Sequence, residues 1–108
     1  IGIREFEILV TLVAGPKHGY GIMDELRETD SGNRILGPGT LYRLLKELAG
    51  KGLIAVADSP AEDSGGPPRR YYRLTAKGQR AAATEAHRLA GLVARARPLI
   101  VARAPKTG

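Results

Sequence analysis

Residues 37–52, GPGTLYRLLKELAGKG, are the most informative stretch of this chain, and they predict a short helix that Gly50-Lys51-Gly52 ends. Pro38 suits the first helical position, where its missing N–H would have no partner. Four leucines at spacings i, i+3, i+4 and i+7 form an apolar stripe, which we expect to pack on two preceding helices. They are Leu41, Leu44, Leu45 and Leu48.

The other sides of this helix carry mainly hydroxyl groups and charges. The outward positions are Thr40, Tyr42, Arg43, Lys46 and Glu47. Thr40, Arg43 and Glu47 share one ridge, and Arg43 is long enough to reach a guanine edge in the major groove of DNA. Gly37 and Gly39 leave little bulk at the helix N-terminus, where free N–H groups suit a phosphate. The start of this helix is therefore expected to approach DNA.

Two of these features also have a purely structural interpretation. Tyr42 would then close the domain core, because aromatic side chains bury readily. The segment Gly37-Pro38-Gly39 would be a simple turn, and without flanking helices the motif is weak. The sequence leaves both alternatives open.

Two further helices are predicted before this one. Residues 4–14 are too densely apolar for a single stripe, which predicts a largely buried helix that Gly15-Pro16 stops. Apolar and acidic residues on opposite faces predict a second helix over residues 19–30, ended by Ser31-Gly32-Asn33. Residues 34–36 are a short extended candidate.

A β-hairpin is predicted after the third helix. Residues 53–58 and 70–74 are its strand candidates, and residues 59–69 between them are rich in Pro, Gly and charge. Arg69 and Arg70 lie beside this tip, where they would reach a phosphate or the minor groove as a wing does. The alternative is that both are solvated and block strand addition at the edge.

Alternation along the second strand assigns its side chains to two faces. Tyr72 and Leu74 fall on one face and Tyr71 and Arg73 on the other. We therefore expect one face to pack on the core and the other to remain available to DNA.

The last predicted element is a long helix, with Thr75 as its N-cap and an end near Arg97, where Pro98 ends or kinks it. Residues 104–108 are expected to fray. Apolar residues at spacings of 4, 3, 4 and 3 are typical of a coiled-coil seam, which a second copy of the chain would cover. They are Ala82, Ala86, Leu89, Val93 and Ala96. The alternative is that this helix folds back on its own domain.

The order helix, helix, helix, hairpin, long helix is that of a winged helix-turn-helix. The predicted fold class is thus mainly α with a small β-hairpin (α+β). We expect residues 1–74 to form the DNA-binding domain and residues 75–104 to form a dimerisation helix, within one compact domain overall.

The charge of the chain favours a polyanionic partner. Its 108 residues include 17 Lys and Arg against 11 Asp and Glu, which gives a net charge of +6. The surplus is uneven, because residues 1–33 have a net charge of −3 and residues 34–108 one of +9. Nucleic acid is therefore the first candidate partner, although solvation alone also explains a charge of this size.

Composition argues against catalysis, cofactors and metals. The chain has no Cys and only two His, His18 and His87, which excludes disulfides and thiolate metal sites and leaves no evident nucleophile or acid–base pair. We expect no enzyme activity, no cofactor and no metal. With no signal segment, no apolar run of 18 residues and no initial Met, we expect a cytoplasmic, nucleoid-associated protein trimmed at its start, without a membrane partner.

Five stretches of the sequence resemble the PadR family of bacterial transcriptional regulators, in particular its small members with one long C-terminal helix. They run in family order over roughly residues 4–97, and the two glycine-rich blocks together are specific. The stretches are residues 6–9 (FEIL), 15–22 (GPKHGYGI), 37–43 (GPGTLYR), 52–54 (GLI) and 70–75 (RYYRLT).

The resemblance implies a homodimeric repressor that binds double-stranded DNA at an inverted repeat, often released by a small-molecule effector. The long helix has no Trp, Phe or Tyr and so offers an effector no aromatic platform. We expect Thr40, Tyr42 and Arg43 to contact bases, with Gly39 beside them. Phosphate contacts are expected from Lys17, Tyr20, Lys46, Arg69 and Arg70.

The sequence leaves open the role of His18 and the kind of partner that the winged helix binds. His18 matches the family block at the start of the second helix, but a lone histidine there also suits a cap or brace. A winged helix is also reused as a protein–protein interaction module without specific DNA binding, and the acidic first third of the chain would fit that role.

Overall fold

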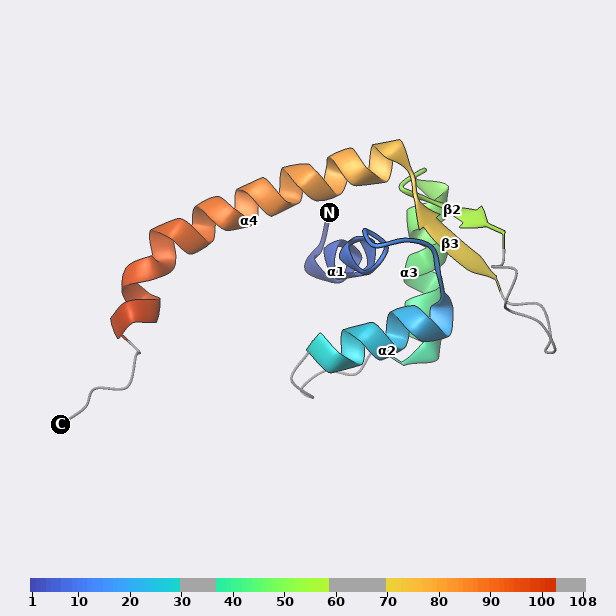
Figure 1. Cartoon of the computed structure of the whole chain (residues 1–108), viewed down its shortest axis with the longest axis horizontal. Coiled ribbons are helices and arrows are strands. Elements are labelled where there is room, and N and C mark those ends of the chain that lie inside the picture. Colours follow the sequence, from blue (N-terminus) through green and yellow to red (C-terminus); the bar gives the residue numbers. More distant parts are fainter. Residues whose placement is uncertain (30–36, 59–69, 103–108) are drawn as a thin grey trace.

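The computed structural model describes residues 1–29, 37–58 and 70–102 of the chain. In these ranges the fold is mainly helical with a small antiparallel sheet, as predicted (Figure 1). The elements are α1 (Ile3–Thr11), β1 (Lys17–His18), α2 (Gly19–Thr29), α3 (Pro38–Gly50), β2 (Ile54–Ala57), β3 (Tyr71–Leu74) and α4 (Ala76–Ala102). The proposed hairpin tip with Arg69, the segment 30–36 and the terminal residues 103–108 lie outside the described residues.

The core forms where α1, α2 and α3 meet, and the leucine stripe of α3 lies inside it. All four leucines of the stripe are buried. They pack in one cluster with Ile8 and Leu9 of α1 and Ile22 of α2. The predicted direction of the stripe is therefore confirmed, and it fixes which side of α3 remains outside.

Helix α1 is shorter and less buried than the sequence predicts. It ends at Thr11, whose hydroxyl donates to the Ile8 carbonyl at 2.7 Å, instead of continuing to residue 14. Val10 and Val13 are 46% and 67% exposed. The expectation of a largely buried helix is therefore wrong for this side of α1. The density of apolar residues does not reveal which elements pack on α1, and these are mainly α2 and α4.

The sheet contains a strand that was not predicted from the sequence. Within the described residues the strand order is β1-β3-β2, with both pairings antiparallel. Strand β1 has two residues, too few for any alternation to be visible, and it pairs His18 with Tyr71. Their rings are 5.2 Å apart and almost perpendicular.

This additional strand changes the environment of β3. Tyr71 and Tyr72 are both buried, whereas Arg73 is exposed. The prediction that Tyr71 shares an open face with Arg73 is therefore wrong. The ring of His18 packs edge-on against Tyr71, so this part of the second face is also covered.

The turn between α3 and β2 is tied to two other elements. Lys51 Nζ donates to Glu5 of α1 at 2.8 Å, and this hydrogen bond lowers the pKa of the Glu5 carboxyl below its ordinary value. Gly52 has a φ of +77°, a left-handed conformation that disfavours other residues. Its carbonyl accepts a hydrogen bond from the Thr75 hydroxyl at 2.7 Å. These contacts hold the C-terminal end of α3 in place.

Helix α4 begins as predicted and ends later. The Thr75 hydroxyl caps it by accepting the Gly78 N–H at 2.9 Å. The predicted end near Arg97 is wrong, because the helix continues through Pro98 to Ala102. A proline removes one helical hydrogen bond and crowds the preceding turn, which kinks a helix without always ending it. The ribbon in Figure 1 indeed changes direction near its C-terminal end.

The long axis of the molecule follows α4. Figure 1 shows this helix passing α1 and extending beyond the other elements, and the overall extents are 58 × 29 × 25 Å. Its outer half has exposed apolar side chains, which are, from the inside outward, Leu92, Val93, Leu99, Ile100 and Val101. No helix in the described ranges combines the length and apolarity of a membrane span.

Candidate nucleic-acid interface

The outward side of α3 carries the polar residues that the sequence predicts there. Thr40, Arg43 and Lys46 are exposed. The Arg43 guanidinium lies 3.0 Å from Glu47 Oε2, one turn further along the same ridge. Both side chains are about half exposed, and an exposed ion pair of this kind contributes little to stability. Arg43 can therefore exchange Glu47 for another partner at low cost.

The first turn of α3 is open. Gly37 is the N-cap with extended backbone angles and provides no side-chain cap, and Pro38 lies in the first turn. Apart from the adjoining residues and the backbone of the helix itself, no atom lies within 4 Å of the place where a Cβ on Gly37 or Gly39 would be. The free N–H groups of this turn are thus accessible to an anion. Gly37-Pro38-Gly39 therefore fits both interpretations given above: it is a turn, and it also leaves the start of α3 open.

Tyr42 is not a core residue, since its side chain is 51% exposed. The packed part of its ring lies against Gly19, the first residue of α2. A Cβ built on Gly19 would be 2.8 Å from Tyr42 Oη and 3.0 Å from Cε1. Gly19 was not identified from the sequence as part of this surface. The available signal was a glycine directly before Tyr20, but it does not reveal a partner 23 positions away.

The start of α2 contributes Tyr20 and His18, which differ in their surroundings. Tyr20 is 64% exposed, at the second position of the helix. His18 Nδ1 accepts the Gly21 N–H at 3.0 Å, as an N-cap does, and its ring packs against Tyr71. The geometry thus matches the structural alternative for His18, that it caps and braces the helix.

Replacing His18 tests this structural role. His18→Ala removes both the cap acceptor and the edge-to-face contact with Tyr71, so we expect a loss of about 1–2 kcal/mol in the free energy of unfolding. Urea denaturation followed by circular dichroism measures the loss. His87→Ala is the matched control, because His87 is exposed on α4, and its effect should stay within about 0.5 kcal/mol. Equal effects of the two variants would contradict the capping role.

Lys17, predicted to contact phosphate, is directed toward its own chain. Its ammonium group donates to the Thr11 carbonyl at 2.6 Å and lies 3.5 Å from Glu25 Oε1. The side chain is only 24% exposed. It closes the C-terminal end of α1 and joins it to α2. A phosphate contact would require Lys17 to give up these partners.

The predicted wing is described only at its base. Arg70 is exposed directly before β3, and Arg73 is exposed within it. The structure thus gathers Gly39, Thr40, Tyr42, Arg43 and Lys46 on one helix and brings Tyr42 to the start of α2. Arg70 and Arg73, before and within β3, belong to a separate part of the chain.

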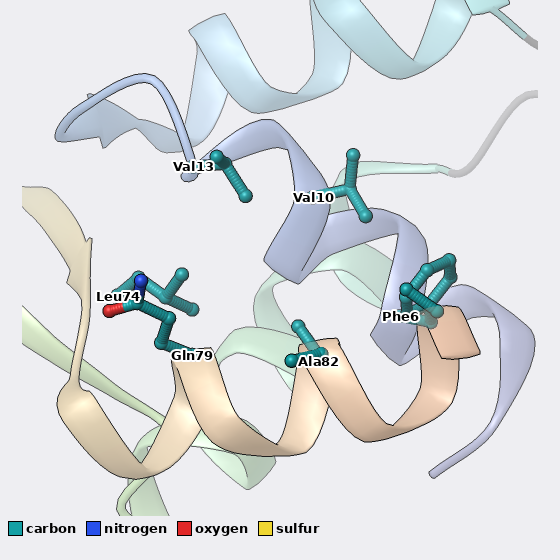
Figure 2. A pocket seen from close by; sticks show the side chains of 8 residues that line it. Phe6, Val10, Val13, Leu74, Gln79 and Ala82 are labelled. Atoms are coloured by element: carbon teal, nitrogen blue, oxygen red, sulfur yellow. The ribbon is translucent and has the colours of Figure 1, made fainter. Parts of the chain in front are cut away.

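The predicted dimer seam divides into an inner and an outer part. Ala82 is buried in the core of its own chain, whereas Ala86 and Val93 are exposed and Leu89 and Ala96 are partly exposed. Beside Ala82 and Ala86 lies an apolar pocket of about 200 Å³ between α1 and α4 (Figure 2). It is lined by Phe6, Val10, Val13, Leu74, Gln79, Ala82, Ala83 and Ala86.

The described residues contain no cluster of three or more His, Asp or Glu side chains that could hold a metal ion. Two surface features stand out. One is the polar side of α3 with its open first turn, and the other is an apolar strip formed by the exposed Val10, Val13, Leu92, Val93, Leu99, Ile100 and Val101.

Comparison with known proteins agrees with this architecture. A family model described as "Transcriptional regulator PadR-like family" matches residues 8–84. A 37.1 kDa protein in transposon Tn4556 of Streptomyces fradiae is 39% identical over 88 residues, which are 82% of this chain and 23% of that protein. The chain therefore spans about a quarter of the length of this curated relative.

Solved structures show the same fold. A PadR family transcription regulator from Clostridium difficile R20291 is 27% identical with a TM-score of 0.77, covering 92% of this chain and 99% of that one. Bacillus subtilis PadR, solved in complex with operator DNA, has a TM-score of 0.66 at 22% identity. The match covers 77% of this chain and 46% of that one, and at this identity it shows the fold alone.

Proposed function

The chain belongs to the PadR-like family of transcriptional regulators, and we propose that it is a sequence-specific DNA-binding repressor that acts as a homodimer on an inverted-repeat operator. The observation that carries the proposal is the outward side of α3. There an open first turn and the exposed Thr40, Tyr42, Arg43 and Lys46 are directed away from the core. The related Bacillus subtilis PadR was solved with operator DNA.

The exposed groups divide into two roles. Thr40, Tyr42 and Arg43 contact base edges in the major groove, where an arginine pairs in a bidentate manner with guanine. Tyr20, Lys46 and Arg70, together with Arg69, contact phosphates and fix the orientation of the protein on the duplex. Because each phosphate contact releases counterions, the affinity should fall steeply with salt concentration.

The apolar strip supports the homodimer. Val10 on α1, Val13 in the turn after it and the outer half of α4 expose apolar side chains that a monomer in water would be expected to cover. If α4 of a second copy packs along α1 and α4 of the first, it covers both groups of apolar side chains. In this arrangement the seam begins at Ala86, because Ala82 is already packed within its own domain. A two-fold dimer also matches a two-fold operator.

The size of the apolar pocket between α1 and α4 also limits where an effector would bind. The pocket of one chain, about 200 Å³, is smaller than the 300–1,000 Å³ of typical small-molecule sites. An effector between the core and α4 would therefore need walls from the second copy as well. Its binding would tilt one DNA-binding domain relative to the other and change the spacing of the two recognition helices.

Selection of bound duplexes from random-sequence DNA tests the proposal, followed by a titration at fixed salt. We expect Arg43→Ala to weaken binding to the selected duplex by about 1–3 kcal/mol and to relax one base position in each half-site. Arg80→Ala is the control, since Arg80 is exposed on α4 and does not belong to α3. Equal losses on selected and random DNA would contradict base recognition by Arg43.

A protein–protein interaction module predicts a different result. In that case the wild-type protein would enrich no sequence from the random pool. That outcome would contradict the proposed function.

A further inference from the structure

We propose that Gly19 is a positioning residue of the DNA-binding surface: its bare backbone supports the ring of Tyr42 and thereby fixes the phenol group on the outward side of α3. The inference rests on the proposed function and adds a residue that makes no predicted contact with DNA itself. It links the start of α2 to the helix that contacts bases.

The geometry leaves no space for a side chain at position 19. A Cβ there would lie 2.8 Å from Tyr42 Oη, 3.0 Å from Cε1 and 3.1 Å from Cζ. These separations are shorter than van der Waals contact between heavy atoms. The ring of Tyr42 thus occupies the volume in which any other residue at position 19 would begin.

Backbone conformation does not explain this glycine. Among the described glycines, only Gly15 and Gly52 have a positive φ, so Gly19 has angles that alanine also adopts. Gly19 is the first residue of α2, where alanine costs the helix nothing. The requirement for glycine at this position therefore comes from the neighbouring ring.

A Cβ at position 19 would displace the ring rather than the backbone. The backbone of the first turn of α2 is held by the hydrogen bond from the Gly21 N–H to His18 Nδ1 and by the pairing of β1 with β3. The Tyr42 side chain is half exposed and can turn toward solvent. The fold should therefore persist while the phenol group leaves its position.

A fixed ring favours specific binding. A side chain that is already held in one orientation loses less conformational freedom when a complex forms. Displacing the Tyr42 ring affects contacts to base edges, because these contacts depend on where the phenol group lies. Contacts to phosphates from Lys46 and Arg70 are unaffected.

A double-mutant cycle tests the inference with the full chain. The probes are a duplex that the wild-type protein selects from random DNA and a random-sequence duplex of the same length, at one salt concentration. Gly19→Ala should weaken binding to the selected duplex about tenfold and leave the random duplex unchanged. Thermal unfolding should stay within a few degrees of the wild type, which shows that the variant is folded.

Tyr42→Ala should have a similar effect, and adding Gly19→Ala to it should change the affinity by less than about twofold, because the ring is then absent. Gly21→Ala is the matched control, since its Cβ would lie 3.6 Å from the nearest atom of His18, an ordinary contact. Additive effects in the cycle, or an equal loss for Gly21→Ala, would overturn the inference while leaving the proposed function intact. A wild-type protein that selects no duplex would overturn the proposed function itself.

Discussion

Gly78→Ala is expected to destabilise the protein by about 3 kcal/mol or more, a large effect for the addition of a single methyl group. A Cβ on Gly78 would overlap the Leu53 carbonyl oxygen and lie 3.0 Å from Leu74 Cδ1. The obstacle is backbone, so no side chain can turn away to make room. The first turn of α4 passes directly over the start of β2, and only glycine permits this approach.

Neither backbone segment can easily shift. The Gly78 N–H is bound to the Thr75 hydroxyl at 2.9 Å, and the Leu53 N–H donates to the Leu48 carbonyl at 3.0 Å. The Leu53 carbonyl also accepts the Thr75 N–H. Displacing the start of α4 would break the hydrogen bonds that Thr75 donates to the Leu53 and Gly52 carbonyls and would separate α4 from the core.

Gly91→Ala provides the matched control. Gly91 also lies within α4, but no atom from elsewhere in the chain lies within 4 Å of its Cβ position. We expect this variant to stabilise the helix by up to about 1 kcal/mol. Urea unfolding at one protein concentration measures both variants, because the proposed dimer would make stability depend on concentration. Similar midpoints for the two variants would contradict the close approach at Gly78.

The double variant Val10→Asp with Val13→Asp is expected to convert the proposed dimer to a monomer and to weaken operator binding about a hundredfold or more. Both side chains are exposed in one chain, so the substitutions need not unfold it. In the proposed dimer they are covered by apolar residues of the second copy, and burying an unpaired carboxylate there is costly. The monomer binds one half-site and loses the advantage of two linked contacts.

Sedimentation equilibrium measures the mass, which should fall from twice 11.5 kDa to 11.5 kDa. Val56→Asp is the control, because Val56 is a similarly exposed valine on β2. It should leave the dimer intact. A double variant that remains dimeric would show that α1 is not part of the interface.

Several features of the candidate site were predictable because they depend on neighbours close in the sequence. The leucines of α3 repeat with the helical period, which fixes their buried side and, by exclusion, the exposed side with Thr40 and Arg43. Thr75 is three residues from Gly78, the N–H that it caps. The ion pair between Arg43 and Glu47 likewise follows from a spacing of one helical turn.

Other features of the site were not predictable, because they arise from contacts between distant residues. Lys17 carries the charge expected of a phosphate contact, yet the end of α1 and Glu25 hold its ammonium group. Ala82 fits the heptad spacing of a dimer seam, yet its own domain covers it. A spacing pattern identifies the apolar side of a helix but not which surface covers it.

The amino-acid sequence by itself determined the order of the four helices and of the hairpin strands, the side of α3 that faces the core, the cap of α4 and the family, because periodicity, capping and turn chemistry act over a few residues. Only the tertiary structure decided that Lys17-His18 forms a strand, that both Tyr71 and Tyr72 are buried, and that Gly19 and Gly78 must lack side chains. The physical reason is that close packing depends on which distant segments meet, and that no local pattern records the distance between them.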